Sequence, residues 1–207
     1  MDKYELKIGI FGGAFDPPHI AHLRIAEEVK EVFNLNYIWF IPAGDPPHKK
    51  TFAEFSDRLK MLELAVKNNP DFKVLDIEKD IRPSYTVRTL QTLKKLYPEF
   101  RFFFIMGWDS FKEIETWWNA SQILNYAELI VVSRGEISPE EAQIFIKKTY
   151  KKLWKEFPEN YIHFYSMPRL EISATLVRNL IKKGRSVRYL LPEEVFFYIK
   201  EKKLYRN

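Results

Sequence analysis

The residues best suited to chemistry lie in the segment 9–22, which reads GIFGGAFDPPHIAH. His19 and His22 open a predicted helix three residues apart, which places both imidazoles on one face of it. Ahead of them, Gly12 and Gly13 are predicted to turn the chain after a short apolar strand, where the backbone can approach a ligand closely. Because a helix N-terminus presents unpaired N–H groups to anions, the segment predicts a phosphate site beside two imidazoles. An ordinary strand–turn–helix connection with histidines exposed by chance is the alternative.

A second segment with similar chemistry is Ile172–Arg178, which reads ISATLVR. Ser173 can cap a helix, and Thr175 and Arg178 project from one side of its opening turns. Helix N–H groups, two hydroxyls and a guanidinium together suit a polyphosphate. Taken alone, capping plus a surface arginine is the simpler interpretation. Two such helix starts in one short chain favour a phosphate clamp.

The elements that must position these segments are indicated by the apolar runs. Strands are predicted at residues 8–11, 37–41, 102–106 and 129–132, with a further one at 161–165. Helices are predicted at residues 19–33, 56–67, 86–96, 111–124, 138–156, 173–183 and 192–202. Strands that are apolar throughout are buried on both faces, which is typical of a parallel sheet covered by helices. The alternation of strands and helices therefore predicts an α/β fold with a doubly wound parallel sheet.

The glycines indicate where a ligand binds. The chain has only seven, and the pair Gly12 and Gly13 follows directly on a predicted strand, as do Gly44, Gly107 and Gly135. Turns after parallel strands gather at the carboxyl edge of the sheet, where open α/β sheets bind ligands. We therefore expect a pocket lined by backbone at this edge.

Composition limits the class of protein. The 207 residues are 46% hydrophobic and 16% aromatic, which predicts one domain over 1–207 with a small C-terminal helical part at about 173–207. A net charge of +5 suits polyphosphate ligands as well as nucleic acid. The absence of cysteine excludes disulfides and thiolate chemistry. With no signal peptide and no apolar run of about 20 residues, we expect a cytoplasmic protein without a membrane span.

Three familiar ligand sites do not match these segments. No Gly-Lys-Ser/Thr ends the first turn, so it is not a Walker A loop. The run Gly12-Gly13-Ala14 lacks the G-x-G-x-x-G spacing of a dinucleotide fingerprint. A zinc site on His19 and His22 has no evident third ligand, because His48 and His163 belong to other elements.

The two segments together resemble the nucleotidylyltransferase superfamily. The first resembles its signature G-G-x-F-D-P-x-H-x-x-H, and the second its motif I-S-x-T-x-x-R. Further segments are similar to bacterial nicotinate-nucleotide adenylyltransferases: PPHK at 46–49, PSYT at 83–86, GWD at 107–109 and TWW at 116–118. Ala21 stands where glycine is usual and Ala174 where serine is common, and neither departure removes a polar group.

This resemblance implies a Rossmann-like nucleotidylyltransferase fold and transfer of the adenylyl group of ATP to nicotinate mononucleotide, which gives deamido-NAD and pyrophosphate. The catalytic residues that it implies are His19, His22 and Arg178. The ATP-binding residues that it implies are Phe11, Gly12, Gly13, His19, His22, Gly107, Asp109, Ile172, Ser173, Thr175 and Arg178. The mononucleotide-binding residues that it implies are Gly13, Ala14, Phe15, Lys49, Tyr85, Thr86, Trp117 and Arg134.

The implied mechanism is in-line attack of the mononucleotide 5′-phosphate on the α-phosphorus of ATP, with no protein nucleophile. Charged His19 and His22 would hold the α- and β-phosphates, and Thr175 and Arg178 the β- and γ-phosphates. Mg²⁺ would bridge phosphate oxygens with few protein ligands, and we expect no dedicated protein metal site.

Other residues have implied roles around the two substrates. Asp109 would meet the adenosine ribose, Trp117 would stack on the pyridine ring, and Arg134 would contact the acceptor phosphate. The alternative for Trp117 is a place among the core aromatics, since the chain has five tryptophans and seventeen phenylalanines. Asp16 is interpreted as structural, fixing the Pro-Pro turn. The loop 42–55 is interpreted as a lid over the mononucleotide.

Alternatives remain open. The acceptor is nicotinamide mononucleotide or phosphopantetheine in two of them, and the end motifs are shared with pantetheine-phosphate adenylyltransferases. A nucleic-acid-binding module is a third, although the lysines are scattered among acids without a basic stripe. A catalytically silent nucleotide sensor is a fourth. We expect small-molecule substrates, no nucleic-acid partner and a possible homo-oligomer.

Overall fold

The computed structural model describes residues 6–47, 50–135, 139–154, 160–168 and 170–206. The chain forms two compact units, one of Met1–Ile10 with Tyr85–Arg169 and one of Phe11–Ser84 with Leu170–Asn207. We call them the central unit and the outer unit, respectively. The outer unit contains residues 11–22 of the first segment and all of the second, the two segments predicted to bind phosphate.

The strands form one sheet in the order β3-β2-β1-β4-β5-β6. They are β1 (Lys7–Gly13), β2 (Tyr37–Pro42), β3 (Phe72–Val74), β4 (Arg101–Gly107), β5 (Glu128–Arg134) and β6 (Ile162–Met167). The pairs β2–β3, β4–β5 and β5–β6 are parallel, with Ile105 opposite Ile130 in the second of them. This order is the Rossmann order, so the prediction of a doubly wound parallel sheet is confirmed.

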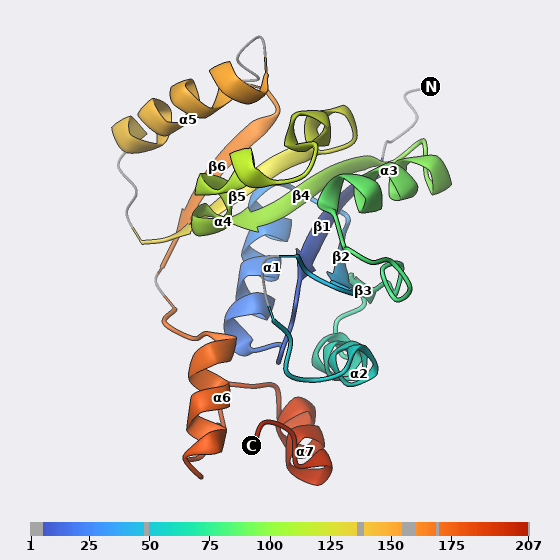
Figure 1. Ribbon diagram of the computed structural model, residues 1–207, viewed down its shortest axis with the longest axis vertical. Coiled ribbons are helices and arrows are strands. Elements are labelled where there is room, and N and C mark those ends of the chain that lie inside the picture. Colours follow the sequence, from blue (N-terminus) through green and yellow to red (C-terminus); the bar gives the residue numbers. More distant parts are fainter. Residues whose placement is uncertain (1–5, 48–49, 136–138, 155–159, 169, 207) are drawn as a thin grey trace. The chain divides into compact units, whose positions relative to one another are not determined.

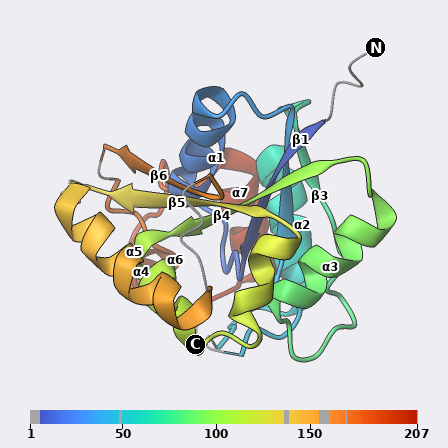
Figure 2. The same ribbon diagram turned by 90° about the horizontal axis from the view of Figure 1, so that it is seen from above.

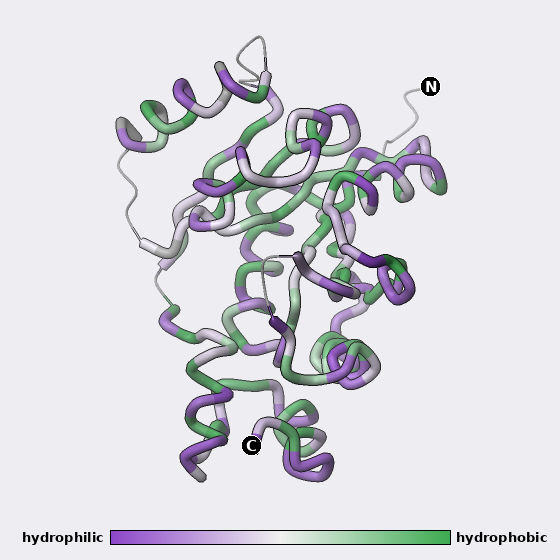
Figure 3. Tube along the Cα trace, viewed as in Figure 1, coloured by the Kyte–Doolittle hydropathy of each residue, from purple (hydrophilic) through white to green (hydrophobic). Residues whose placement is uncertain are grey.

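Apolar side chains explain why these segments are strands. Residues 102–106 of β4 and 129–132 of β5 are all buried, which confirms that the sheet is covered on both faces. Figure 3 shows the strands mostly in green, whereas the helices alternate between green and purple. The helices therefore bury one face each.

The helices are α1 (Ile20–Val32), α2 (Phe55–Val66), α3 (Thr86–Leu96), α4 (Trp108–Lys112), α5 (Pro139–Leu153), α6 (Ala174–Lys182) and α7 (Glu193–Lys202). Within the central unit, α4 and α5 lie along one face of β4 and β5 (Figure 2). Predicted and observed helices agree within a few residues except in the region after β4. The first and last residues of the predicted helix 138–156 lie outside the described residues. In the part of the chain that the structure describes, no helix is long and apolar enough to cross a membrane.

Three predictions about local structure are wrong. The predicted helix 111–124 is instead α4 followed by two short 3₁₀ helices, Ile114–Thr116 and Ala120–Asn125. It breaks because Trp117 is extended, with ψ 141°, and Asn119 is left-handed, with φ 50°. The predicted turn at Gly12 and Gly13 is wrong because β1 continues through both. Strand β3 was not predicted, because three residues carry too short an apolar pattern.

The two C-terminal helices pack onto α2 in the outer unit (Figure 1). Met61 of α2, Val177 of α6 and Val195 of α7 are completely buried in one apolar cluster. At its margin, the Tyr198 hydroxyl donates to the Asp57 carboxylate at 2.8 Å. Burial, and the hydrogen bond to Asp57, raise the pKa of Tyr198 to about 12. The helical part at the C-terminus is thus attached to the same unit as α1.

Gly44, directly after β2, is a position where any side chain is excluded. A β-carbon there would lie 2.0 Å from the Glu78 carbonyl oxygen, which belongs to the backbone. We expect Gly44→Ala to destabilise the protein by about 2–3 kcal/mol and to lower its melting temperature by roughly 4–12 °C. Gly107→Ala is the matched control, because a β-carbon at Gly107 meets nothing within 4 Å. Equal melting temperatures for both variants in differential scanning calorimetry would contradict this.

Candidate functional site

The two histidines of the first segment lie against each other at the start of α1. His19 is the N-cap residue and is only 2% exposed. Its ring stacks on that of His22, with 3.6 Å between centroids and 21° between planes. The backbone N–H of His19 donates to Nδ1 of His22 at 3.2 Å. The predicted pairing of the two imidazoles on one face of the helix is therefore confirmed.

This hydrogen bond determines which nitrogen of His22 can act on a ligand. Because Nδ1 accepts from a backbone N–H, it carries no proton, so the ring is neutral and its proton is on Nε2. Two charged rings at a 3.6 Å spacing would also repel each other. The structure thus favours a neutral His22 that donates through Nε2, in place of the charged imidazole that we expected from the sequence.

Aromatic rings surround His22 on its apolar side. The Phe15 ring meets it edge-on at 5.1 Å and the Phe11 ring at 6.1 Å. Phe40 of β2 packs behind both phenylalanines at 5.6 and 5.8 Å. Phe15 has a positive φ of 48°, and its ring packs within this cluster. The imidazole is therefore oriented by packing as well as by its hydrogen bond.

The first N–H of α1 is not available to an anion. Ile20 donates it to the Leu190 carbonyl oxygen at 3.0 Å, and the N–H of His22 returns to the His19 carbonyl at 2.9 Å. The expected presentation of unpaired N–H groups at this helix start is wrong for these two residues. Ala21 is 1% exposed, so its methyl group, where the resembling family has glycine, is packed inside the unit.

Arg178 connects the second segment to the first across 162 positions of the sequence. Its Nη1 donates to the Asp16 carbonyl oxygen at 2.7 Å, and its Nη2 donates to the Thr175 hydroxyl at 3.2 Å. Ser173 caps α6 by accepting the N–H of Leu176 at 3.1 Å, as predicted. The structure therefore brings together, within the outer unit, the two segments that are predicted to bind phosphate.

Asp16 is structural, as predicted, but its partners differ from the Pro-Pro turn that we expected it to fix. Its carboxylate, 3% exposed, accepts the N–H of Phe52 at 2.6 Å and that of Ala53 at 3.2 Å. It also accepts the Tyr205 hydroxyl at 2.6 Å. Asp16 thus ties the first segment to the end of the loop 42–55 and to the C-terminal residues.

Arg58 of α2 is a residue of this region that the sequence analysis missed. Its side chain, 1% exposed, donates to the carbonyls of Ala14 at 2.9 Å, Ala53 at 3.3 Å and Gly44 at 3.4 Å. Burial lowers its pKa, and the nearby charge of Asp16 opposes that effect. The only signal in the sequence was an arginine among apolar helix positions, and such residues usually face solvent.

The loop 42–55 is anchored near its start by two hydrogen bonds and near its end by the Phe52 and Ala53 N–H groups, which donate to Asp16. The Ala43 N–H donates to the Gly13 carbonyl at 2.8 Å, and the Asp45 N–H donates to the Ser84 hydroxyl at 2.9 Å. Lys49, and His48 beside it, lie outside the described residues. The lid role of this loop, and the contact of Lys49 with the mononucleotide, stay predictions.

The central unit holds the other predicted site residues. Gly107 ends β4 and is the N-cap residue of α4. Its dihedral angles are ordinary and an added β-carbon would meet nothing within 4 Å, so the fold would also accept a side chain there. The Asp109 carboxylate is 95% exposed and pairs with Lys112 at 2.8 Å. A carboxylate so exposed is accessible to a ligand hydroxyl. The side chain of Arg134 lies outside the described part of the structure.

The tryptophans after α4 differ in their surroundings. Trp117 meets the Phe104 ring edge-on at 6.3 Å and is half-buried. Trp118 stacks on Tyr85, the N-cap residue of α3, at 4.9 Å, and the Arg88 guanidinium lies 4.7 Å from the Trp118 ring centre. The structure therefore brings Tyr85 against Trp118, whereas Trp117 packs against Phe104.

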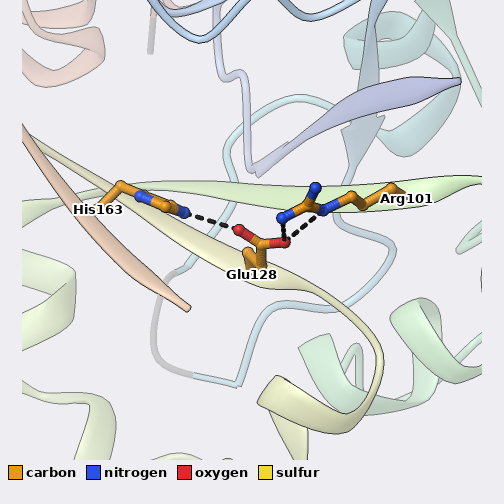
Figure 4. Close-up of polar contacts among 3 residues, drawn as sticks. All are labelled: Arg101, Glu128 and His163. Atoms are coloured by element: carbon orange, nitrogen blue, oxygen red, sulfur yellow. Dashed lines mark hydrogen bonds and ion pairs between the residues drawn. The ribbon is translucent and has the colours of Figure 1, made fainter. Parts of the chain in front are cut away.

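One further polar cluster lies at the opposite end of the strands from Gly107. Glu128, buried at the start of β5, accepts from Arg101 at 2.5 Å and bonds His163 at 2.7 Å (Figure 4). Arg101 opens β4, so this cluster marks the amino ends of the strands. It therefore braces the sheet away from the predicted carboxyl-edge site, and it explains His163 without a metal.

The side chains near the two histidines bear on how a Mg²⁺ ion could be held. Among them, no group of three or more His, Cys, Asp or Glu side chains is arranged to hold a metal. The nearest carboxylate to the histidines in sequence, Asp16, already accepts three hydrogen bonds. The N–H donors of His22 and Arg178 suit phosphate oxygens, and a Mg²⁺ ion bound through those phosphates stays a prediction.

Comparison with known proteins identifies similar chains. A model of the cytidylyltransferase-like family matches residues 10–180. A probable nicotinate-nucleotide adenylyltransferase of Desulfitobacterium hafniense is 40% identical over 203 residues, covering 97% of this chain and 96% of the relative. One of Exiguobacterium sibiricum is 40% identical over 205 residues, covering 97% and 99%. The solved Plasmodium falciparum nicotinic acid mononucleotide adenylyltransferase complexed with NaAD has a TM-score of 0.79 at 23% identity, covering 97% and 98%, and shares the fold.

Proposed function

The chain belongs to the cytidylyltransferase-like family, and from this we propose that it transfers the adenylyl group of ATP to nicotinate mononucleotide, giving deamido-NAD and pyrophosphate. The full-length relatives at 40% identity support this reaction. The observation in the structure that carries the proposal is the hydrogen bond from Arg178 to Asp16. This bond joins the helix start that bears the stacked histidines to the one that bears Thr175.

The chemistry requires positioning of reactants and no protein nucleophile. The ionised 5′-phosphate of the mononucleotide attacks the α-phosphorus in line, and pyrophosphate leaves with the electron pair of the broken P–O bond. Catalysis therefore consists of holding two anions that repel each other and stabilising charge on the leaving group. Mg²⁺, when bound with ATP, supplies further neutralisation of the phosphate charge.

Within the outer unit, each donor has a distinct task. His22 donates a hydrogen bond from Nε2–H to an oxygen of the reacting phosphate, and the stacked His19 holds that ring in place. Arg178 and Thr175 bind the β- and γ-phosphates. An arginine has five N–H donors, and the two bonds described for Arg178 leave others for phosphate oxygens.

For the central unit, the roles follow from exposure. Asp109 accepts hydrogen bonds from the adenosine ribose, and the backbone beside Gly107 accommodates the nucleotide. Main-chain N–H groups at Tyr85 and Thr86, where α3 begins, receive the nicotinate carboxylate. Trp117 stacks on the pyridine ring.

Nicotinamide mononucleotide is the second candidate acceptor. Its amide is nearly isosteric with the carboxylate, but it carries no charge. A helix start that offers only N–H donors stabilises an anion more than an amide. We therefore propose that the acid is preferred.

A direct assay decides among the acceptors. The protein is incubated with Mg-ATP and, separately, with nicotinate mononucleotide, nicotinamide mononucleotide or phosphopantetheine, and pyrophosphate release is measured. We expect the fastest release with nicotinate mononucleotide and none after chelation of Mg²⁺. Salt-sensitive binding of DNA or RNA without any pyrophosphate release would instead support a nucleic-acid-binding module.

Trp117→Leu tests the acceptor site. We expect the KM for nicotinate mononucleotide to rise about two- to twelvefold, because a ring stack is lost, while the KM for ATP stays unchanged. Trp118→Leu is the matched control, since Trp118 stacks on Tyr85 and Arg88 of its own chain. The opposite pattern in steady-state kinetics would assign the ring-binding role to Trp118.

A further inference from the structure

The guanidinium of Arg178 is held on three sides inside the outer unit. The Asp16 carbonyl and the Thr175 hydroxyl accept hydrogen bonds from its two terminal nitrogens. The Phe52 ring lies beneath its plane, with 4.2 Å from the guanidinium carbon to the ring centre. Phe52 itself is 61% exposed, and its ring contacts the guanidinium of Arg178. An exposed aromatic ring at the end of a loop is thus placed against the arginine.

Two of these three supports depend on one residue, Asp16. The Asp16 side chain accepts the N–H of Phe52 at 2.6 Å, which places the ring, and the backbone of the same residue supplies the carbonyl. The carboxylate is in turn held by the Tyr205 hydroxyl at 2.6 Å. A series of contacts therefore runs from Tyr205 to Asp16, from Asp16 to Phe52, and from Phe52 to Arg178.

The Tyr205 hydroxyl keeps the proton with which it donates to Asp16. Burial, together with the charge of Asp16, raises its pKa, so that the phenol stays protonated. The hydroxyl and the N–H of Ala53 donate to the same carboxylate oxygen, while Phe52 donates to the other. Both carboxylate oxygens are therefore saturated by donors from distant parts of the sequence.

We propose that Tyr205 and Phe52 are positioning residues that hold Arg178 in its phosphate-binding orientation before ATP arrives. Arginine has many rotamers, and ordering it on binding weakens affinity. A guanidinium already aligned by the Asp16 carbonyl and the Phe52 ring avoids that cost. This inference rests on the proposed role of Arg178 in binding the ATP phosphates.

The experiment compares four variants of the full chain: Tyr205→Phe, Phe52→Leu, Phe52→Tyr and Tyr198→Phe. Tyr198→Phe is the matched control, because it also removes one hydroxyl–carboxylate bond from the same unit but at Asp57, away from Arg178. Calorimetric titration with Mg-ATP, without acceptor, gives the ATP dissociation constant. Steady-state assays give the KM for each substrate, and scanning calorimetry gives the melting temperature.

We expect Tyr205→Phe and Phe52→Leu to weaken ATP binding about three- to tenfold, with the KM for the mononucleotide unchanged. Phe52→Tyr keeps the ring and restores affinity, and Tyr198→Phe has no effect on it. In an Arg178→Ala background, Tyr205→Phe and Phe52→Leu add nothing further. Phe52 is exposed, so Phe52→Leu keeps its fold and remains informative if Tyr205→Phe is unstable.

Three outcomes overturn the proposal, and they are distinguishable. If Arg178→Ala binds ATP as well as the unmodified protein, the phosphate role of Arg178 fails and the inference with it. If Arg178→Ala weakens ATP binding but Phe52→Leu does not, only the positioning role is wrong. Equal weakening of ATP and mononucleotide binding in Phe52→Leu also contradicts positioning, because it indicates a general structural effect.

Discussion

Replacing His22 with asparagine is expected to lower kcat about 100-fold while the melting temperature changes little. The asparagine carboxamide oxygen sits near the place of Nδ1 and can accept the His19 N–H that His22 accepts now at 3.2 Å. The start of α1 is thereby preserved. The Nε2 donor, however, is lost, and removing one preorganised donor from a developing negative charge costs about 100- to 1000-fold.

The comparison with His22→Ala sharpens this expectation. Alanine removes both the Nε2 donor and the acceptor for the His19 N–H, along with the ring contacts to Phe11 and Phe15. We expect a similar loss of kcat but a lower melting temperature. Rapid-quench or steady-state kinetics on both variants separate the two effects. A rate loss in His22→Asn that merely parallels its loss of folded protein would mean that His22 is structural.

Arg178→Ala is expected to reduce kcat/KM for ATP by roughly 10- to 150-fold. The loss corresponds to about 1.5–3 kcal/mol, the contribution of a hydrogen bond to a charged group. Arg178→Lys keeps the charge but not the planar guanidinium. We therefore expect its kcat/KM for ATP to lie between those of Arg178→Ala and the unmodified protein. Turnover and ATP affinity within threefold of the unmodified protein would mean that Arg178 does not bind the phosphates.

The control for Arg178→Ala is its melting temperature, since the side chain also donates to Asp16. That bond is a single contact to a carbonyl, and Asp16 keeps its three carboxylate bonds in the variant. We therefore expect a decrease of only a few degrees in differential scanning calorimetry. A loss of activity far larger than the loss of folded protein identifies a functional arginine.

Local patterns predicted most of the elements, because a buried strand or helix face requires apolar residues at regular positions. The runs at 102–106 and 129–132 are apolar at every position, and both are central strands of the sheet. The pattern of residues 111–124 led to a wrong prediction, a single helix. Its apolar residues suit a helix, but the left-handed backbone at Asn119 interrupts it, and no periodicity reports such a residue.

The predicted site shows the same division. The spacing of His19 and His22 was sufficient to predict their common face, because three residues nearly complete a helical turn. The hydrogen bond that leaves Nε2 as the donor of His22 could not be predicted, since it depends on the exact entry of the backbone into α1. The use of the Ile20 N–H by Leu190 was equally hidden, because the two residues are far apart in sequence.

By itself, the sequence determined the type of fold and the family, and it predicted the two segments with phosphate-binding chemistry, because each is recognised from residues close together along the chain. Only the tertiary structure decided what holds those segments together. Buried Arg58, the carboxylate of Asp16 and the hydroxyl of Tyr205 act on partners from other elements. A side chain's partner across space leaves no local pattern, so the histidine and arginine sites became one arrangement only when the chain was folded.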